Sequence, residues 1–256
     1  MKLRIVRADP AGNITIFVLN AVPADQRSEI ARAILTKKEL AAEQVAFQTG
    51  ENRIDMAGGE FCGNASRAFG MLLAKERGIC GKAELAIEIS GCDGPVKVSV
   101  NTENHEASAD MPLPRSVLER TVGDVRGTLV DLGGIAHFVT EEAKPELSFF
   151  RRAESLFDEL PDIGAYGVIF LEKGGSRIYP LIRVPAAESL VWEGSCGSGS
   201  VACAVRRSLG IEGEYAENYI QPAGNIIASV TRKNGRIVNT RIGGRVELEA
   251  EREVYI

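Results

Sequence analysis

The sequence has no hydrophobic run that approaches the roughly 18 residues needed to cross a membrane, and its start lacks the apolar core and cleavage site of a signal peptide. These absences predict a cytoplasmic protein with no membrane partner. The chain also lacks a basic surplus. Its formal net charge is -5, and Arg206 with Arg207 is too short a run to follow a phosphate backbone, so we expect no nucleic-acid partner.

Cysteine and histidine are both scarce. Five cysteines in 256 residues are too few for a disulfide framework, and in a reducing compartment they should persist as thiols. The histidines are His105 and His137, and no cysteine pair has the spacing of a zinc site, so we expect no metal ion. Neither a Gly-x-Ser-x-Gly motif nor a Cys-His-Asn set is evident. A hydrolase using Cys196 and His137 stays open, but it would leave Cys62 without a role.

Two stretches of the sequence share an unusual frame: "GGEFCGNASRAFG" at 58–70 and "EGSCGSGSVACAV" at 193–205. In each, a cysteine is followed by glycine, a small polar residue and then helix-compatible residues. This pattern predicts Cys62 and Cys196 at two helix N-termini. There, unpaired backbone N–H groups and the positive end of the helix dipole favour a thiolate and can also hold a carboxylate.

The rest of the chain predicts an α/β protein with many short strands and few helices. Each half has strands, a cysteine loop, a helix and then further strands, which suggests a duplicated domain. Two prolines close together in the stretch 109–124 mark the predicted boundary, giving domains 1–115 and 116–246. Helices are expected at 24–39, 64–78, 151–160 and 199–210.

Two such cysteines on either side of an α-amino acid would invert its Cα without a cofactor, one thiolate taking the proton and the opposing thiol returning one. The other three cysteines, Cys80, Cys92 and Cys203, are expected to be structural or incidental. A dinucleotide site at "GSGSVA", 197–202, is disfavoured because no second βαβ unit follows it. A protein that keeps the cleft as a binding site without turnover is the alternative from another class.

The segments "FCGNASR" and "SCGSGSVACA" resemble the two cysteine motifs of the diaminopimelate epimerase superfamily of cofactor-independent racemases and epimerases. The resemblance implies two pseudo-symmetric α/β domains, each a curved mixed or antiparallel sheet wrapped around a central helix. It also implies that the strand at 247–256 returns to the first domain. By the same resemblance, Cys62 and Cys196 are the acid/base pair. The implied substrate contacts are Gly63, Asn64, Gly197 and Ser198 at the α-carboxylate, with Asn13 and Gln44.

The sequence departs from diaminopimelate epimerases where they hold the distal end of their substrate. Ala187 and Glu188 stand in place of a Glu-Arg pair, and "GGIAH" at 133–137 replaces an Asn-Pro-His segment. A diaminopimelate epimerase, or a racemase of another amino acid, is therefore the weaker alternative.

The sequence is closer to the histidine racemases of opine-type metallophore pathways, which it resembles in "AGNIT", "EQVAF", "GGEFCGNA" and "SLVWEGSCGSG". That resemblance implies histidine as the substrate, with Glu43 binding the imidazole N–H or the α-ammonium. It also implies that Trp192 and Glu193 shape the second cysteine loop. The expected partner is a small-molecule amino-acid substrate, no cofactor is expected, and a homodimer is compatible with the sequence. We do not expect the mechanism to need His105 or His137.

Overall fold

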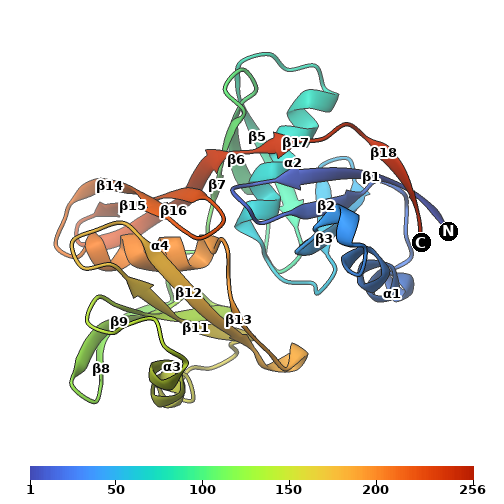
Figure 1. Ribbon diagram of the computed structural model, residues 1–256. Helices are drawn as coiled ribbons and strands as arrows, with labels where there is room; N and C mark the ends of the chain where they lie inside the picture. Colours follow the sequence, from blue (N-terminus) through green and yellow to red (C-terminus); the bar gives the residue numbers. More distant parts are fainter. The chain divides into compact units, whose positions relative to one another are not determined.

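The computed structural model describes residues 1–256, and the chain divides into two units (Figure 1). The first unit consists of Met1–Asp110 together with Gly243–Ile256, and the second is Met111–Ile242. The end of the chain therefore belongs to the same unit as its beginning. None of the helices has the length and hydropathy of a membrane-spanning segment.

A mixed sheet forms most of the first unit. Its strands run in the order β7-β6-β5-β4-β3-β2-β1-β17, and β18 also pairs with β1. The β2/β3 and β4/β5 pairs are parallel, while β1 is antiparallel to β2, β17 and β18. The strands are β1 (Lys2–Asp9), β2 (Thr15–Val18), β3 (Gln44–Gly50), β4 (Arg53–Met56), β5 (Lys82–Ile89), β6 (Val96–Asn101), β7 (Glu106–Asp110), β17 (Glu247–Leu248) and β18 (Arg252–Tyr255).

Helix α2 (Gly63–Glu76) is the central helix of the first unit. Every residue from Gly63 to Ala74 is buried, because the helix packs against β5, β6, β7 and β17. At Gly70 an added Cβ would lie 2.4 Å from Val98 Cγ1, so the lack of a side chain there lets α2 approach β6. The unit also contains α1 (Ala24–Leu35) and the short 3₁₀ turn η1 (Lys38–Leu40).

The second unit has a six-stranded sheet in the order β13-β12-β11-β10-β9-β8, in which the β10/β11 pair is parallel. Three further strands follow in the chain, and β14 pairs with β15 along its whole length. The strands are β8 (Ser116–Val122), β9 (Val125–Asp131), β10 (Ile135–Thr140), β11 (Ala165–Leu171), β12 (Ile178–Val184), β13 (Ser189–Trp192), β14 (Gly213–Ile220), β15 (Asn225–Lys233) and β16 (Arg236–Arg245). The last residues of β16, from Gly243, belong to the first unit.

Helix α4 (Gly197–Arg207) is the central helix of the second unit. Its residues from Gly199 to Val205 are buried, and it packs against β9, β10, β11, β14 and β15. The unit also contains α3 (Leu147–Ala153) and the 3₁₀ turns η2 (Glu154–Leu156) and η3 (Pro185–Ala187). The helix predicted at 151–160 was partly wrong, since the α-helix begins at Leu147 and ends at Ala153. Phe149 and Phe150 anchor this shorter helix in the aromatic core of the unit.

Candidate active site

The two motif cysteines are the N-caps of the two central helices, α2 and α4. Cys62 and Cys196 both have extended backbone conformations, with φ/ψ of -134°/110° and -118°/108°. The Sγ atom of each accepts the backbone N–H three residues later at 3.4 Å. The serine four residues later, Ser66 or Ser200, donates to the cysteine carbonyl oxygen at 2.8 Å. The two helix starts therefore match bond for bond.

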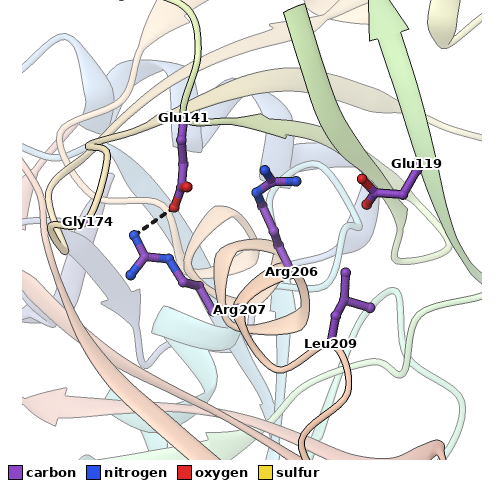
Figure 2. A pocket seen from close by; sticks show the side chains of 6 residues that line it. All are labelled: Glu119, Glu141, Gly174, Arg206, Arg207 and Leu209. Carbon is purple, nitrogen blue, oxygen red and sulfur yellow. Dashed lines mark ion pairs between the residues drawn. The ribbon is translucent and has the colours of Figure 1, made fainter.

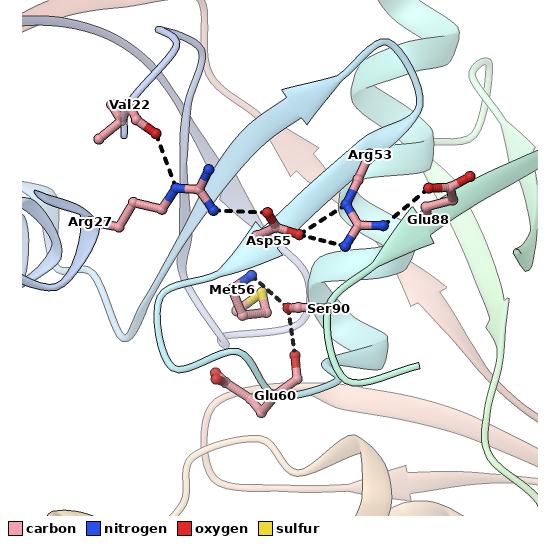
Figure 3. A network of polar contacts seen from close by, with 8 residues as sticks. All are labelled: Val22, Arg27, Arg53, Asp55, Met56, Glu60, Glu88 and Ser90. Atoms are coloured by element: carbon pink, nitrogen blue, oxygen red, sulfur yellow. Dashed lines mark hydrogen bonds and ion pairs between the residues drawn. The ribbon is translucent and has the colours of Figure 1, made fainter. Parts of the chain in front are cut away.

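The loop that leads into Cys62 is fixed from the end of β5. Ser90 Oγ accepts the Met56 N–H at 2.8 Å and donates to the Glu60 carbonyl oxygen at 3.0 Å (Figure 3). Next to it, Gly91 has φ +69°, and an added Cβ would lie 2.3 Å from Phe61 N. The loop passes so close to position 91 that only glycine, which has no side chain, fits there.

Strand β4, which precedes this loop, is held by ion pairs at Asp55. Asp55 accepts from Arg27 at 2.8 Å and from Arg53 at 3.0 Å, and Arg53 also pairs with Glu88 at 3.1 Å (Figure 3). Arg27 additionally donates to the Val22 carbonyl oxygen at 3.1 Å, which ties α1 to the same network. These contacts join β4, β5 and α1 on one side of the Cys62 loop.

The structure brings together the residues that sequence reasoning assigned to the first half of the site. The Cys62 thiol donates to Gln44 Oε1 at 3.1 Å, and Asn13 Nδ2 donates to Glu43 Oε2 at 3.1 Å. Glu43 and Gln44 are neighbours in the chain, so the two contacts are linked. Asn64 lies on the first turn of α2, two residues after Cys62.

Asn13 and Glu43 form the acidic end of this cluster. Asn13 is buried, and its Oδ1 atom has no partner. Glu43 is an exposed residue, but partial burial of its carboxyl group raises the pKa of that group. The Asp9 carboxylate raises the pKa further, and the hydrogen bond from Asn13 lowers it. Asp9 and Glu43 together give this region a negative potential that suits a cationic or N–H donating group.

Burial decides the ionisation of Cys62. It raises the pKa of the thiol to about 11, against the lowering effects of the Ala65 and Asn64 N–H groups and of Gln44. The nearby Glu60 carboxylate raises the pKa further. The helix start therefore acts in the predicted direction, but desolvation is larger. At neutral pH Cys62 therefore favours the thiol.

In the second unit, Cys196 lies at the end of a short chain of polar contacts. Ser198 Oγ is 3.5 Å from Cys196 Sγ and 2.8 Å from His137 Nε2. His137 comes from β10 and is fully buried, its Nδ1 atom has no partner, and burial lowers its pKa to about 3. His137 is therefore neutral at physiological pH, and it holds the residue predicted to bind the α-carboxylate.

The backbone of the second cysteine is held by Gln221, which lies directly after β14. Its Oε1 atom accepts the Cys196 N–H at 2.7 Å, and its Nε2 atom donates to Ser200 Oγ at 3.0 Å. Burial raises the pKa of the Cys196 thiol well above its usual value, and the Glu193 carboxylate raises it further. Ser198 and the Gly199 N–H oppose this rise. At neutral pH this cysteine favours the thiol.

Sequence reasoning missed Gln221 and set His137 aside. Both lie far from the motif in the chain and reach it only through the folding of β10 and β14. The one local signal was a serine four residues after each cysteine, which both motifs contain. Gln221 donates to the second of these serines, Ser200. Trp192, proposed to shape the second loop, is 46% exposed and lies 5.8 Å from Phe170 between ring centroids.

The remaining cysteines lie elsewhere. Cys203 is buried inside α4, Cys80 is exposed, and Cys92 is partly exposed; all five cysteines of the chain are free thiols. A hollow of about 500 Å³ lies near the C-terminal end of α4, whereas Cys196 is at the N-terminal end. It is lined by Glu119, Glu141, Gly174, Arg206, Arg207 and Leu209, with Arg207 paired to Glu141 at 2.7 Å (Figure 2).

Comparison with known proteins extends over the whole chain. A family model described as the histidine racemase CntK N-terminal domain matches residues 2–255. A histidine racemase of Fusobacterium nucleatum is 31% identical over 271 residues, which cover 99% of this chain and 97% of that protein. A histidine racemase of Staphylococcus aureus is 26% identical over 272 residues, with 97% and 96% covered. The predicted resemblance is thereby confirmed.

Solved structures with low sequence identity share the fold. A predicted epimerase from Pseudomonas aeruginosa superposes with a TM-score of 0.68 at 15% identity, covering 99% of each chain. A hydroxyproline epimerase from Agrobacterium vitis gives a TM-score of 0.63 at 13% identity, covering 99% of this chain and 92% of that one. The predicted α/β fold with a helix at the centre of each sheet is confirmed. The chain is an isomerase of the racemase and epimerase class, and it belongs to the histidine racemase family.

Proposed function

We propose that the protein interconverts L- and D-histidine without a cofactor, with Cys62 and Cys196 as the two acid/base groups. The observation that carries the proposal is the match between the two helix starts. Each offers a thiol as N-cap, with Sγ accepting an N–H at 3.4 Å and a serine closing on the cysteine carbonyl at 2.8 Å. A structural cysteine gives no reason for the same set of bonds to occur twice.

In this mechanism, one thiol acts on each face of the substrate Cα. The thiolate takes the Cα proton and becomes a thiol. The carbanion left on Cα then receives a proton from the opposite thiol, which becomes the thiolate. The reverse reaction exchanges the roles, so the active form carries one proton on the pair. No redox change and no further reactant is needed.

The substrate carboxylate is held at the two helix N-termini. The N–H groups of Gly63, Asn64, Gly197 and Ser198 belong to the first turns of α2 and α4, where backbone donors lack intrahelical partners. Both helix dipoles favour an anion at this point. They also stabilise the negative charge that develops on the carboxylate of a Cα carbanion.

Histidine is the favoured substrate because of the acidic cluster beside Cys62. Glu43, held by Asn13 and close to Asp9, offers an acceptor for an imidazole N–H or an ammonium group. The histidine racemases of Fusobacterium nucleatum and Staphylococcus aureus are similar along nearly the whole chain, which supports the same choice. Ala187 and Glu188 are exposed at and after η3, and neither can bind a second carboxylate as an arginine would.

The test is incubation with L-histidine in D2O without pyridoxal phosphate, followed by chiral separation and mass spectrometry. We expect D-histidine that carries deuterium at Cα. A panel of other L-amino acids and diaminopimelate measures the specificity, and faster exchange of diaminopimelate would contradict the histidine assignment. Absence of Cα exchange across the whole panel would favour the alternative of a binding protein without turnover.

We place the enzyme in the cytoplasm, where a reducing environment keeps two catalytic thiols free. The five unpaired cysteines support this location. The homodimer stays a prediction, which light scattering of the purified chain tests.

A further inference from the structure

Arg67 is the largest fully buried side chain, and it lies on α2 five residues after Cys62. Its Nε donates to Asn64 Oδ1 at 3.1 Å and its Nη1 to the Arg245 carbonyl oxygen at 3.0 Å, while Nη2 has no partner. These partners are an amide and a carbonyl rather than carboxylates. Burial lowers the pKa of Arg67 to about 10, which still leaves the guanidinium charged at neutral pH.

A buried charge without an ion pair is costly, so the fold itself gains nothing from it. The equivalent position of the second unit is occupied by an uncharged residue. Val201, five residues after Cys196, is equally buried. Ser198 takes the place of Asn64, and its partner is the neutral His137. Since the two helix starts otherwise match, the cation at Arg67 is specific to the side of Cys62.

The guanidinium determines which way the Asn64 amide faces. A guanidinium has only donors, so it binds the Oδ1 atom and leaves the Nδ2 group of Asn64 to donate elsewhere. Asn64 is the residue that the proposed function assigns to the substrate carboxylate. Arg67 thus holds Asn64 in the orientation that presents N–H groups, together with the backbone donors of the first turn of α2.

The guanidinium also changes the charge around the cysteine. Arg67 interacts electrostatically with Cys62 and with Asp9. The other groups that act on Cys62 are the Glu60 carboxylate, which opposes a thiolate, and the Gln44 amide with the helix-start N–H groups, which favour it. Cys196 has the Glu193 carboxylate beside it, which favours the thiol. A carboxylate thus lies near each cysteine, whereas the buried cation is on the Cys62 side.

We propose that Arg67 is a positioning residue that orients Asn64 toward the substrate carboxylate and supplies a buried positive charge that makes Cys62 the more readily ionised of the two cysteines. This inference rests on the proposed function for the role of Asn64. The charge asymmetry can be measured without any substrate.

The first test uses the full-length protein and needs no substitution. The rates at which a small neutral alkylating agent modifies Cys62 and Cys196 are measured over a series of pH values by peptide mass spectrometry, with the exposed Cys80 as the internal reference. The midpoint of each profile reports the thiolate, whereas its amplitude reports access. We expect a Cys62 midpoint at least about one pH unit below that of Cys196, tenfold in thiolate fraction. Equal or reversed midpoints would overturn the proposal.

The second test uses variants. Arg67→Met removes the charge and should raise the Cys62 midpoint by about one pH unit or more without moving that of Cys196. Arg67→Lys keeps a cation but loses the fork that holds Asn64, so the midpoint should stay near wild type while KM rises. The matched control is Val201→Ala, which changes buried volume in the second unit and should move neither midpoint. A folded Arg67→Met protein with an unchanged Cys62 midpoint would refute the role of the charge.

The two proposals fail in different ways. If the midpoints have the expected order but no amino acid is racemised, the proposed function fails and the charge asymmetry stands. If histidine is racemised but Cys196 has the lower midpoint, the proposal that Arg67 favours ionisation of Cys62 fails alone.

Discussion

His137 should make the folded protein sensitive to acid. The side chain is fully buried, its Nδ1 atom has no partner, and burial lowers its pKa from 6.5 to about 3. In the unfolded chain the imidazole takes up a proton as the pH falls through 6.5, while the folded protein stays neutral down to about pH 3. The contribution of this group to stability is therefore complete above about pH 6.5 and is lost progressively below it.

The magnitude follows from the two pKa values. At about pH 5 the unfolded histidine is almost fully protonated and the folded one is not, which lowers the free energy of unfolding by about 2 kcal/mol relative to neutral pH. Domains of ordinary stability have about 5–15 kcal/mol in total, so this loss is easily measured.

The assay is urea unfolding at about pH 7.5 and about pH 5 for the wild type, His137→Gln and His105→Gln. His137→Gln loses stability at both pH values, but the difference between them should shrink by about 2 kcal/mol because no buried imidazole remains. His105 has a side chain that is 55% exposed, so its variant should keep the wild-type difference. An equal loss of stability on acidification in the wild type and in His137→Gln would refute the reasoning.

Three further predictions concern the cysteine loops. Cys62→Ala and Cys196→Ala should each lower racemisation by several orders of magnitude. The variants of the other cysteines, Cys80→Ala, Cys92→Ala and Cys203→Ala, should stay within about tenfold of wild-type kcat. Near-normal turnover of Cys62→Ala or Cys196→Ala would contradict the two-base scheme. Gly91→Ala should destabilise the protein by about 2 kcal/mol or more, because its Cβ would meet Phe61 N, and Gly94→Ala, which has open space around it, should cost less by urea unfolding. Mild oxidation should join Cys62 to Cys196 and stop activity reversibly, and peptide mapping that finds both thiols free in inactivated protein argues against a shared site.

Local features of the site could be predicted from the sequence. The frame shared by the two motifs predicted helices that begin just after Cys62 and Cys196, because capping and the first turn depend on neighbouring residues only. The resemblance to a family implied a central helix in each domain, and α2 is buried from Gly63 to Ala74. Asn13, Glu43 and Gln44 were assigned to substrate binding through the resemblance to a family. In the structure Gln44 accepts from the Cys62 thiol, and Asn13 donates to the neighbouring Glu43.

Features that depend on tertiary contacts could not be predicted in this way. The helix dipole suggested low thiol pKa values, yet burial raises that of Cys62 to about 11, and desolvation is not visible in a local motif. Strand β8 was not predicted, because it lies in the stretch that two prolines marked as a domain boundary. His137 reaches Ser198 only because β10 packs against α4. Nothing in the sequence marks Arg67 as fully buried, because arginine side chains are mostly exposed.

The central claim is that two cysteines share one Cα, and isotope incorporation during the first turnovers tests it most directly. The protein is given L-histidine in D2O, and both enantiomers are recovered early and analysed for deuterium at Cα. Two bases predict deuterium in the D-histidine formed and protium in the L-histidine that remains, because the abstracted proton stays on its own thiol and returns to the same face. The mirror result is expected from D-histidine. Deuterium that enters the recovered L-histidine as fast as D-histidine forms would mean that one base serves both faces, and would contradict the account.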